Sequence, residues 1–337
     1  MKSVKYLLLA VLVTCLFITC KNINDLVTTG LINGFVSDTL GSPISGAQIR
    51  ITPGNQQVQA NDSGYYEIPD IPAGIYTVTA AMAAFIPACD TAVIDSGRVT
   101  TVNFKLKQSQ RNVVGEMLTT ACHCGDVPRT TAYGLIDTHG GRFIYLECHA
   151  SRDPMFDTWD PFADSGSESR RLFYLDTFLI GAVLNLDGSN QLLSSAGYAT
   201  TLDSLLNVPS SLTMQLTGSY SSSSQTGNLE VEITAVDAII FNDLQVLFAV
   251  YERGPIPFSP SGDTVSFRNV LINLMTPENL TIAQGETKQV SKVFSVPDTI
   301  GLPLPPFHVI DVTNIGAAVF VQSQKTKRVL QAASVEF

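Results

Sequence analysis

The sequence predicts a mostly β protein with a central α/β part. Short stretches that alternate apolar and polar residues recur towards both ends of the chain, for example over Val102–Leu106 and Leu229–Ile233. Such alternation is typical of strands with one buried face, and the 24 Gly and 17 Pro residues supply turns between them. Residues 112–186 show instead a pattern of strand, helix and strand. A length of 337 residues favours two or three domains over one.

Residues 1–19 are typical of an export signal. Lys2 and Lys5 form a short positive start, and an apolar run over residues 6–19 follows. This run is shorter than the roughly 20 residues that a membrane-spanning helix needs. We therefore expect a signal peptide that is removed on export rather than a permanent membrane helix.

The signal ends in Phe17-Ile18-Thr19-Cys20, which resembles a bacterial lipobox. The resemblance implies that Cys20 carries acyl chains such as palmitate and becomes the first residue of the mature protein. Cys15 is a second candidate with a shorter apolar core before it, and an ordinary signal with an incidental Cys is the alternative. We expect a lipid-anchored protein of the outer membrane, on its periplasmic side or at the cell surface, with residues 20–30 as the tether.

Residues 31–108 contain several short strands with turn signals between them, which predicts a small β-sandwich. The segment resembles the carboxypeptidase regulatory-like domain, and the resemblance implies a non-catalytic spacer or adhesion module whose fold is similar to a carbohydrate-binding one. Sugar binding is therefore one hypothesis, but we expect Tyr65, Tyr66 and Tyr76 to pack in or beside the core. The residues that carry the resemblance are Gly34, Val36, Asp38, Gly41, Pro43, Gly46, Ala47, Asp62, Gly64, Tyr65, Ile68, Gly74, Tyr76 and Val78.

Residues 109–207 form the predicted α/β part. The pattern E-M-x-T-x-x-C-x-C over Glu116–Cys124 and the stretch I-Y-L-E-C-H-A-S over Ile144–Ser151 resemble the outer-membrane-protein-28-related lipoproteins. Two further stretches near the end of the chain, Val319–Gln322 and Val329–Ala333, extend the resemblance. It implies a thioredoxin-like middle domain.

The chemistry of that domain depends on Cys122 and Cys124. A thioredoxin site has two residues between its cysteines and lies at a helix N-terminus, where the helix dipole stabilises a thiolate. Here His123 alone separates them, so a disulfide between them closes a tight ring that is easily reduced. The third strand also lacks the Pro that faces the cysteines in thioredoxin-like enzymes. These departures favour a structural Cys pair over a redox-active one, which remains the alternative.

Cys148 and His149 end the predicted second strand, at the edge where Cys122–Cys124 is expected. The five residues are of the kind that ligates zinc, but their spacing matches no zinc finger, so we expect neither a metal nor a cofactor. A disulfide from Cys148 to Cys122 or Cys124 is as plausible as one within the Cys-x-Cys pair. Four cysteines follow the anchor and allow three full pairings, namely those among Cys89, Cys122, Cys124 and Cys148.

Residues 208–337 return to alternating strands and predict a second β-sandwich. Five triplets of Asp, Ser or Thr and a small aliphatic residue resemble the O-glycosylation sequon of Bacteroides-type bacteria, and turn residues that precede strands are the alternative reading. The hydroxyl residues of these triplets are Thr39, Thr91, Ser204, Thr264 and Thr299.

The formal net charge of -10 excludes nucleic acid as a partner on electrostatic grounds. Together these features predict a non-enzymatic lipoprotein of the cell envelope that serves as an interaction or structural platform. Its partners are the membrane, through the lipid anchor, and envelope proteins or glycans. The alternatives are a thiol-disulfide oxidoreductase that uses Cys122-His123-Cys124, and a carbohydrate-binding surface protein.

Overall fold

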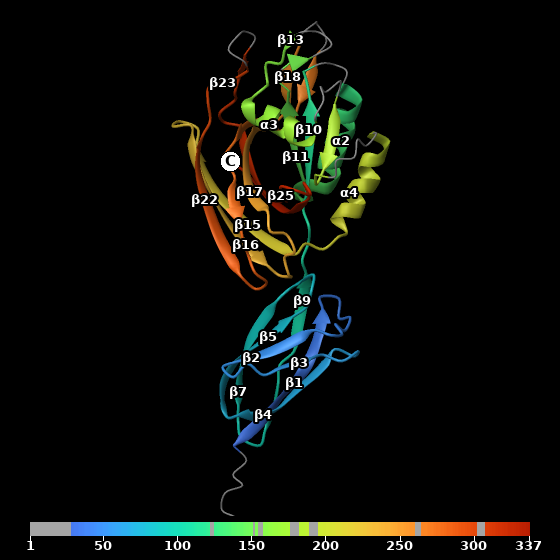
Figure 1. The fold of residues 1–337 in the computed structure, drawn as a ribbon, viewed down its shortest axis with the longest axis vertical. Coiled ribbons are helices and arrows are strands. Elements are labelled where there is room, and N and C mark those ends of the chain that lie inside the picture. The colour runs from blue at the N-terminus through green and yellow to red at the C-terminus, as the bar shows by residue number, and fades with distance from the viewer. Residues whose placement is uncertain are drawn as a thin grey trace, which may run out of the picture. The chain divides into compact units, whose positions relative to one another are not determined.

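The structure is a computed structural model that describes residues 28–121, 125–150, 152–153, 158–175, 182–188, 195–259, 264–301 and 307–337. The chain divides into two compact units (Figure 1). The first contains the chain up to Met82 together with Pro87–Lys107, and the second contains Ala83–Ile86 and Gln108–Phe337. Within the described residues, no helix is both long enough and apolar enough to cross a membrane.

The first unit is a β-sandwich, as predicted. One sheet has the order β4-β1-β9 with β8 beside β1, and the other has the order β3-β2-β5-β7. Alternate residues of these strands are buried between the sheets, which is why the sequence alternates. The strands are β1 Thr29–Asp38, β2 Gln48–Thr52, β3 Gln57–Gln59, β4 Tyr65–Pro72, β5 Gly74–Ala81, β7 Ala88–Ile94, β8 Val99–Thr101 and β9 Phe104–Gln108.

A glycine in β1 permits a close approach of two backbone segments. A Cβ added to Gly34 would lie 1.8 Å from the carbonyl oxygen of Val102, which lies between β8 and β9. The same carbonyl accepts a hydrogen bond of 2.7 Å from the buried hydroxyl of Tyr66. Tyr66 and Tyr76 are buried, as expected from the sequence, whereas Tyr65 lies on the outer face of the sheet beside Phe35.

The second unit is built around a large mixed sheet of order β14-β10-β11-β20-β17-β25-β26, with β21 also paired to β17. The predicted strand–helix–strand pattern is confirmed, because β10 and β11 are parallel and α2 connects them. β14 pairs with β10 in the antiparallel direction. The strands are β10 Val113–Thr119, β11 Phe143–His149, β14 Val183–Leu186, β17 Leu244–Glu252, β20 Val270–Leu274, β21 Glu278–Leu280, β25 Ile315–Ser323 and β26 Val329–Glu336.

This sheet crosses the domain boundary that the sequence predicts near residue 208. Glu147 in β11 is a register partner of Val270 in β20, so strands from both sides of that boundary share one sheet. A three-stranded sheet of order β15-β16-β22 packs against β17 and β25 through one apolar cluster that contains Leu229 and Phe248. The remaining strands are β6 Phe85–Ile86, β12 Arg152–Asp153, β13 Thr158–Trp159, β15 Leu212–Ser221, β16 Thr226–Ala235, β18 Ile256–Phe258, β19 Val265–Phe267, β22 Thr287–Ser295, β23 Thr299–Ile300 and β24 His308–Val309.

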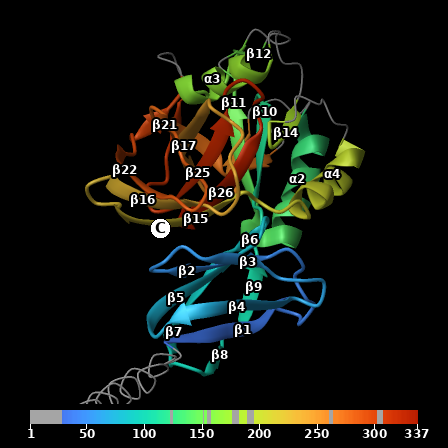
Figure 2. The same cartoon turned by 60° about the horizontal axis from the view of Figure 1, so that its bottom comes forward.

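Helices cover both faces of the parallel strands, so every residue of β10 and β11 is buried. α2 (Asp126–His139) and α4 (Tyr198–Leu206) lie side by side (Figures 1 and 2) and pack on the face that carries Met117 and Tyr145. α3 (Ser165–Tyr174) packs on the opposite face, which carries Leu118 and Cys148. Short 3-10 turns, η2 Gly140–Arg142 and η3 Ser195–Gly197, precede β11 and α4.

Candidate functional site

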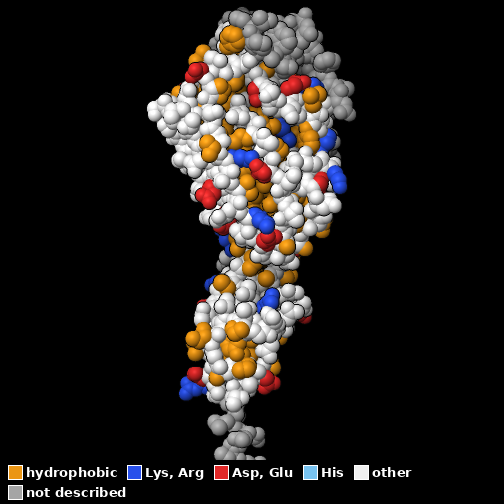
Figure 3. Space-filling model, turned by 60° about the vertical axis from the view of Figure 1, so that its left-hand side comes forward, with side chains coloured by type: hydrophobic (Ala, Val, Ile, Leu, Met, Phe, Trp, Pro, Cys, Tyr) orange, Lys and Arg blue, Asp and Glu red, His pale blue; other side chains and the backbone are white. Residues whose placement is uncertain are grey.

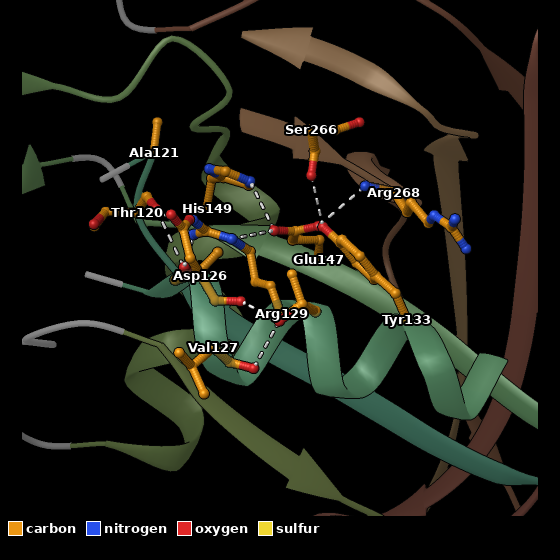
Figure 4. Close-up of polar contacts among 12 residues, drawn as sticks. Thr120, Ala121, Asp126, Val127, Arg129, Tyr133, Glu147, His149, Ser266 and Arg268 are labelled. Atoms are coloured by element: carbon orange, nitrogen blue, oxygen red, sulfur yellow. Dashed lines mark hydrogen bonds and ion pairs between the residues drawn. The ribbon is translucent and has the colours of Figure 1, made fainter. Parts of the chain in front are cut away.

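The carboxyl ends of β10 and β11 meet at one edge of the central sheet, where Thr119 and His149 are register partners. α2 begins nearby at Asp126, and the chain after β13 returns to the same place. Charged and aromatic side chains from these segments gather at this edge (Figure 4). We define the strand-end cluster as Arg129, Tyr133, Glu147, His149 and Asp160.

Glu147 is the fully buried centre of the strand-end cluster. Its Oε2 accepts hydrogen bonds from the Tyr133 hydroxyl at 2.8 Å and from the backbone N–H of Arg268 at 3.2 Å. Its Oε1 lies 3.8 Å from Nε of Arg129 and 3.7 Å from Nε2 of His149. Within the part of the chain that the structure describes, this oxygen accepts no hydrogen bond. Figure 4 shows the carboxylate between these side chains.

Asp160 fixes the orientation of the His149 ring. Its Oδ2 lies 2.9 Å from Nδ1 of His149 and accepts the backbone N–H of Ala121 at 2.6 Å. The ring also packs edge-on against Phe267 and tilted against Phe162, at centroid distances of 4.8 and 5.1 Å. These contacts tie the end of β11 to the residue that immediately precedes Cys122.

Arg129 ties α2 to the end of β10. Its side chain is 2% exposed, and its Nη1 donates to Oγ1 of Thr119 at 3.0 Å and to the carbonyl oxygen of Thr120 at 3.1 Å. Its Nη2 donates to the Asp126 carboxylate one helical turn earlier. The guanidinium also lies over the ring of Phe267. A charged residue in a buried helical position is satisfied in this way with almost no contact with solvent.

Burial governs the electrostatics of the strand-end cluster. It raises the pKa of Glu147 above its ordinary value, while the charges of His149 and Arg129 and the hydrogen bond from Tyr133 act in the opposite direction. Burial also raises the pKa of Tyr133, and the neighbouring Glu147 carboxylate adds to that effect. Tyr133 is therefore a hydrogen-bond donor at neutral pH, and the Glu147 carboxyl is a group that holds a proton more tightly than a glutamate in water.

A cavity of about 290 Å³ lies beside the cluster. Tyr133 and Arg268 lie at its wall, where the Arg268 guanidinium is over the Tyr133 ring at 5.1 Å and pairs with Asp137. Glu147 and His149 do not line the cavity. Its lining residues are Asp126, Arg129, Thr130, Tyr133, Pro255, Thr264, Val265, Ser266 and Arg268.

The strand-end cluster has the components of an acid–base site but not the exposure of one. The Glu147 carboxylate, the His149 imidazole and the Asp160 carboxylate lie in a row, with the imidazole between the two carboxylates. The side chains of Glu147 and His149 are nevertheless both 0% exposed. A general acid or base must come within hydrogen-bond reach of its substrate. In this arrangement the main effect of these groups is to join α2, β10, β11 and the segment after β13.

A second buried network lies on the opposite face of the same strands. Glu116 in β10 accepts two hydrogen bonds from Arg170 in α3, at 2.6 and 2.7 Å, and one from the Tyr174 hydroxyl at 2.6 Å. Gln322 in β25 accepts from Arg170 at 2.9 Å and donates to Tyr174 at 2.7 Å. Every charged group of this network therefore has a partner, and the network locks α3 onto the sheet.

The structure places the sequence-predicted site residues as follows. Cys20, Cys122, His123 and Cys124 lie outside the described residues. Cys148 is a buried free thiol on the α3 face, and burial raises its pKa well above the ordinary value. His149 lies on the other face, so the structure does not bring these two side chains together. Cys89, in the first unit, is an exposed free thiol.

Within the described ranges, no group of three or more His, Cys, Asp or Glu side chains is arranged so that it could hold a metal ion. The hydroxyl residues of the glycosylation-like triplets are all exposed, which leaves them accessible to a modifying enzyme and leaves their glycosylation a prediction. They are Thr39, Thr91, Ser204, Thr264 and Thr299.

Sequence reasoning missed four of the five members of the strand-end cluster. One signal was present, because Glu147 and His149 are two residues apart in an otherwise apolar strand and so share a face. Arg129 offered a second signal, as a charge on the helix that follows the Cys-x-Cys pair. Asp160 follows His149 by 11 residues, after β13, and no sequence pattern connects the two.

Comparison with known proteins identifies the first unit only. Residues 31–107 match the carboxypeptidase regulatory-like domain family, as the sequence predicted. No curated protein matches the chain, and the resemblance to the outer-membrane-protein-28-related family stays a prediction.

Several solved structures match the chain, and two of them each cover 68% of it. HBP35 of Porphyromonas gingivalis matches with a TM-score of 0.51 and 13% identity, covering 68% of this chain and 76% of that one. A structural-genomics protein of Agrobacterium tumefaciens matches with a TM-score of 0.45 and 15% identity, covering 68% and 95%. At this identity the likeness to HBP35 shows a shared fold and nothing about activity.

Proposed function

We propose that the chain is a non-enzymatic, lipid-anchored protein of the cell envelope. In this proposal the first unit is a β-sandwich spacer next to the anchor at Cys20, and the second unit is a platform for interaction with other envelope components. The match of residues 31–107 to the carboxypeptidase regulatory-like domain supports the spacer role.

The observation that carries the non-enzymatic role is the burial of the strand-end cluster. Glu147 and His149 are 0% exposed, and Arg129 and Asp160 are 2% and 3% exposed. Their side chains bond to one another and to the backbone of Thr120 and Ala121. Oε1 of Glu147 and Nε2 of His149 are the two buried cluster atoms without a hydrogen bond among the described residues. Polar groups that are buried in this way, and mostly hydrogen-bonded, support a fixed architecture rather than turnover of a substrate.

Labelling with radioactive palmitate tests the anchor. The wild-type protein should incorporate the label and fractionate with the outer membrane, whereas Cys20→Ala should lose the label and be released in soluble form. Cys15→Ala is the matched control, because it changes the other candidate cysteine and should retain the label. Equal labelling of wild type and Cys20→Ala contradicts the anchor.

A thiol-disulfide oxidoreductase is the second candidate function. The Cys122-His123-Cys124 segment connects the end of β10, which is parallel to β11, to the start of the 14-residue helix α2. A helix N-terminus stabilises a thiolate. This order of elements also supports the thioredoxin-like middle domain implied by the resemblance to the outer-membrane-protein-28-related lipoproteins.

Reduction of insulin disulfides by the purified protein separates the two candidates. The non-enzymatic proposal expects no rate above that of dithiothreitol alone, for wild type and for Cys122→Ser alike. A rate that requires Cys122 and Cys124 but not Cys89 would establish the oxidoreductase instead. Cys89→Ser is the control because that thiol is exposed and lies in the first unit.

A further inference from the structure

The outer face of the sheet β4-β1-β8 carries a pair of aromatic rings, of which Phe35 is exposed and Tyr65 is half-buried. Phe35 in β1 is the register partner of Tyr65 in β4, and their ring centroids are 5.4 Å apart with the planes tilted by 60°. Phe35 is 52% exposed. Neither ring fills the space between the two sheets, where the alternate residues Val36 and Tyr66 lie. The two rings therefore form a small aromatic platform on the surface.

Hydrogen bonds fix the tyrosine of this platform. The Tyr65 hydroxyl donates to Oε2 of Glu67 at 2.6 Å, and the Asn33 amide also approaches the hydroxyl. Asn33 is the register partner of both Glu67 and Thr101, so these groups share one face. The Thr101 hydroxyl in turn donates to Oδ1 of Asn33 at 2.9 Å. The ring of Tyr65 is thus held in place before any ligand arrives, which lowers the entropic cost of binding.

Asn103 offers an oriented hydrogen-bond donor beside Phe35. Its Oδ1 accepts the backbone N–H of Phe35 at 2.9 Å, so its amide nitrogen is directed away from that contact. Among the residues that the structure describes, the Asn103 amide nitrogen has no hydrogen-bond partner, and the residue is exposed. The platform therefore combines two ring faces with amide, hydroxyl and carboxylate groups at its border.

This combination selects the class of ligand. A ring face contacts C–H groups, and the surrounding amides and oxygens pair with hydroxyl groups. Glu67 carries a negative charge on this face, and Lys105 and Lys107 in β9 carry positive charges, so charges of both signs border the rings. β1, which carries Phe35, has strand partners on both sides, so an added peptide strand can pair only with the outer edge of β4 and not beneath the Phe35 ring.

We propose that Phe35 and Tyr65 form a binding platform for a neutral polysaccharide, with Asn103 and Glu67 pairing with its hydroxyl groups. The inference deepens the proposed function and rests on it, since it names the surface and the chemistry of one partner of the envelope platform. Other hydrophobic side chains of this unit are also exposed, as Figure 3 shows for one of its faces, and these provide matched controls. They include Ile75 and Val93, which are register partners on β5 and β7 of the other sheet.

Affinity electrophoresis of the purified full-length protein in gels that contain xylan, mannan, dextran or laminarin tests the proposal. At least one of these neutral polysaccharides should retard the wild type. Phe35→Ala and Tyr65→Ala should each weaken that retardation by about tenfold, as expected for aromatic residues at the centre of a binding site. Phe35→Trp should retain binding because it keeps a ring at this position, and Ile75→Ala and Val93→Ala should bind as the wild type does.

Thermal unfolding of each variant confirms that a loss of binding is not a loss of fold, since both substituted rings lie outside the core. The proposal is overturned if none of the four polysaccharides retards the wild type, or if Ile75→Ala and Val93→Ala lose binding as much as Phe35→Ala. It is also overturned if Phe35→Ala abolishes only the capture of a protein partner. Palmitate labelling and insulin reduction report on the proposed function separately, and the ring variants should leave both unchanged.

Discussion

The side chains of Cys148 and His149, consecutive in β11, lie on opposite faces of the central sheet. Cys148 packs among Leu118, Ile144 and other apolar residues beneath α3, while His149 bonds to Asp160 on the α2 side. The cause is the pleat of the strand, which sends neighbouring side chains in opposite directions. The buried polar groups of the two faces are therefore separate networks with separate consequences.

Cys148 should be unreactive in the folded protein. Its side chain is buried and burial raises its pKa well above the ordinary value, so little thiolate forms at neutral pH. Iodoacetamide treatment under native conditions, followed by mass spectrometry, should modify exposed Cys89 and leave Cys148 unmodified until the protein is denatured. Modification of both at similar rates would show that the α3 face opens in solution.

The sequence was sufficient to predict the strand–helix–strand order and the sandwich of the first unit, because both depend on local periodicity. Alternation over β1, β4 and β9 follows from one buried face. The single sheet that joins β11 to β20 was not predictable in the same way, because that pairing connects Glu147 to Val270 across a long stretch of chain. No local pattern specifies a partner so distant.

The candidate site was predictable only in part for a related reason. His149 was identified from its place at the end of a strand, but the interpretation grouped it with Cys148 and overlooked the pleat. Asp160 lies after a separate strand and reaches His149 only through the tertiary fold. The Asp160 carboxylate also accepts hydrogen bonds from the backbone N–H groups of Ala121 and Phe162, and no sequence pattern predicts these contacts.

The pair Glu116 and Arg170 should be strongly coupled in stability. Arg170→Met leaves the Glu116 carboxylate buried without its cation, which should lower the free energy of unfolding by about 3–5 kcal/mol. Glu116→Leu leaves the Arg170 guanidinium buried without its anion, which should also lower the free energy of unfolding. The double variant removes both charges. Its decrease in the free energy of unfolding, measured by urea titration, should therefore be well below the sum of the decreases of the two single variants. Strictly additive losses would mean that the bidentate pair does not form in solution.

Asp187 should make stability depend on pH. Burial raises its pKa to about 6 in the folded protein, although Arg111 lies 2.6 Å from its Oδ2. In the unfolded chain an aspartate has a pKa of about 3.9, so between these values the folded state binds the proton more tightly. The contribution of this group to stability is therefore greatest at low pH and is lost as the pH rises from about 4 to about 6.

The variant Asp187→Asn isolates this effect, because it has no proton to release. The free energy of unfolding of the wild type minus that of Asp187→Asn should fall by about 2–3 kcal/mol between pH 4 and pH 6. Urea titrations at several pH values measure that difference, in which the other titrating groups cancel. A difference that stays constant or grows with pH would contradict the raised pKa.

Two glycines should respond to the same substitution with opposite signs. A Cβ at Gly34 would lie 1.8 Å from the Val102 carbonyl oxygen, whereas a Cβ at Gly134 in α2 would meet nothing within 4 Å. Gly34→Ala must push apart backbone segments of the first unit, which should cost about 2–3 kcal/mol. Gly134→Ala gains helix propensity at an exposed position and should stabilise α2 by about 1 kcal/mol.

Hydrogen exchange read by mass spectrometry distinguishes the two changes by location. Peptides from β1 and β4 should exchange faster in Gly34→Ala, while peptides from α2 should exchange more slowly in Gly134→Ala. Because each substitution adds the same methyl group, each serves as the control for the other. If Gly34→Ala left the exchange of β1 unchanged, the close approach of β1 to Val102 would not exist in the protein.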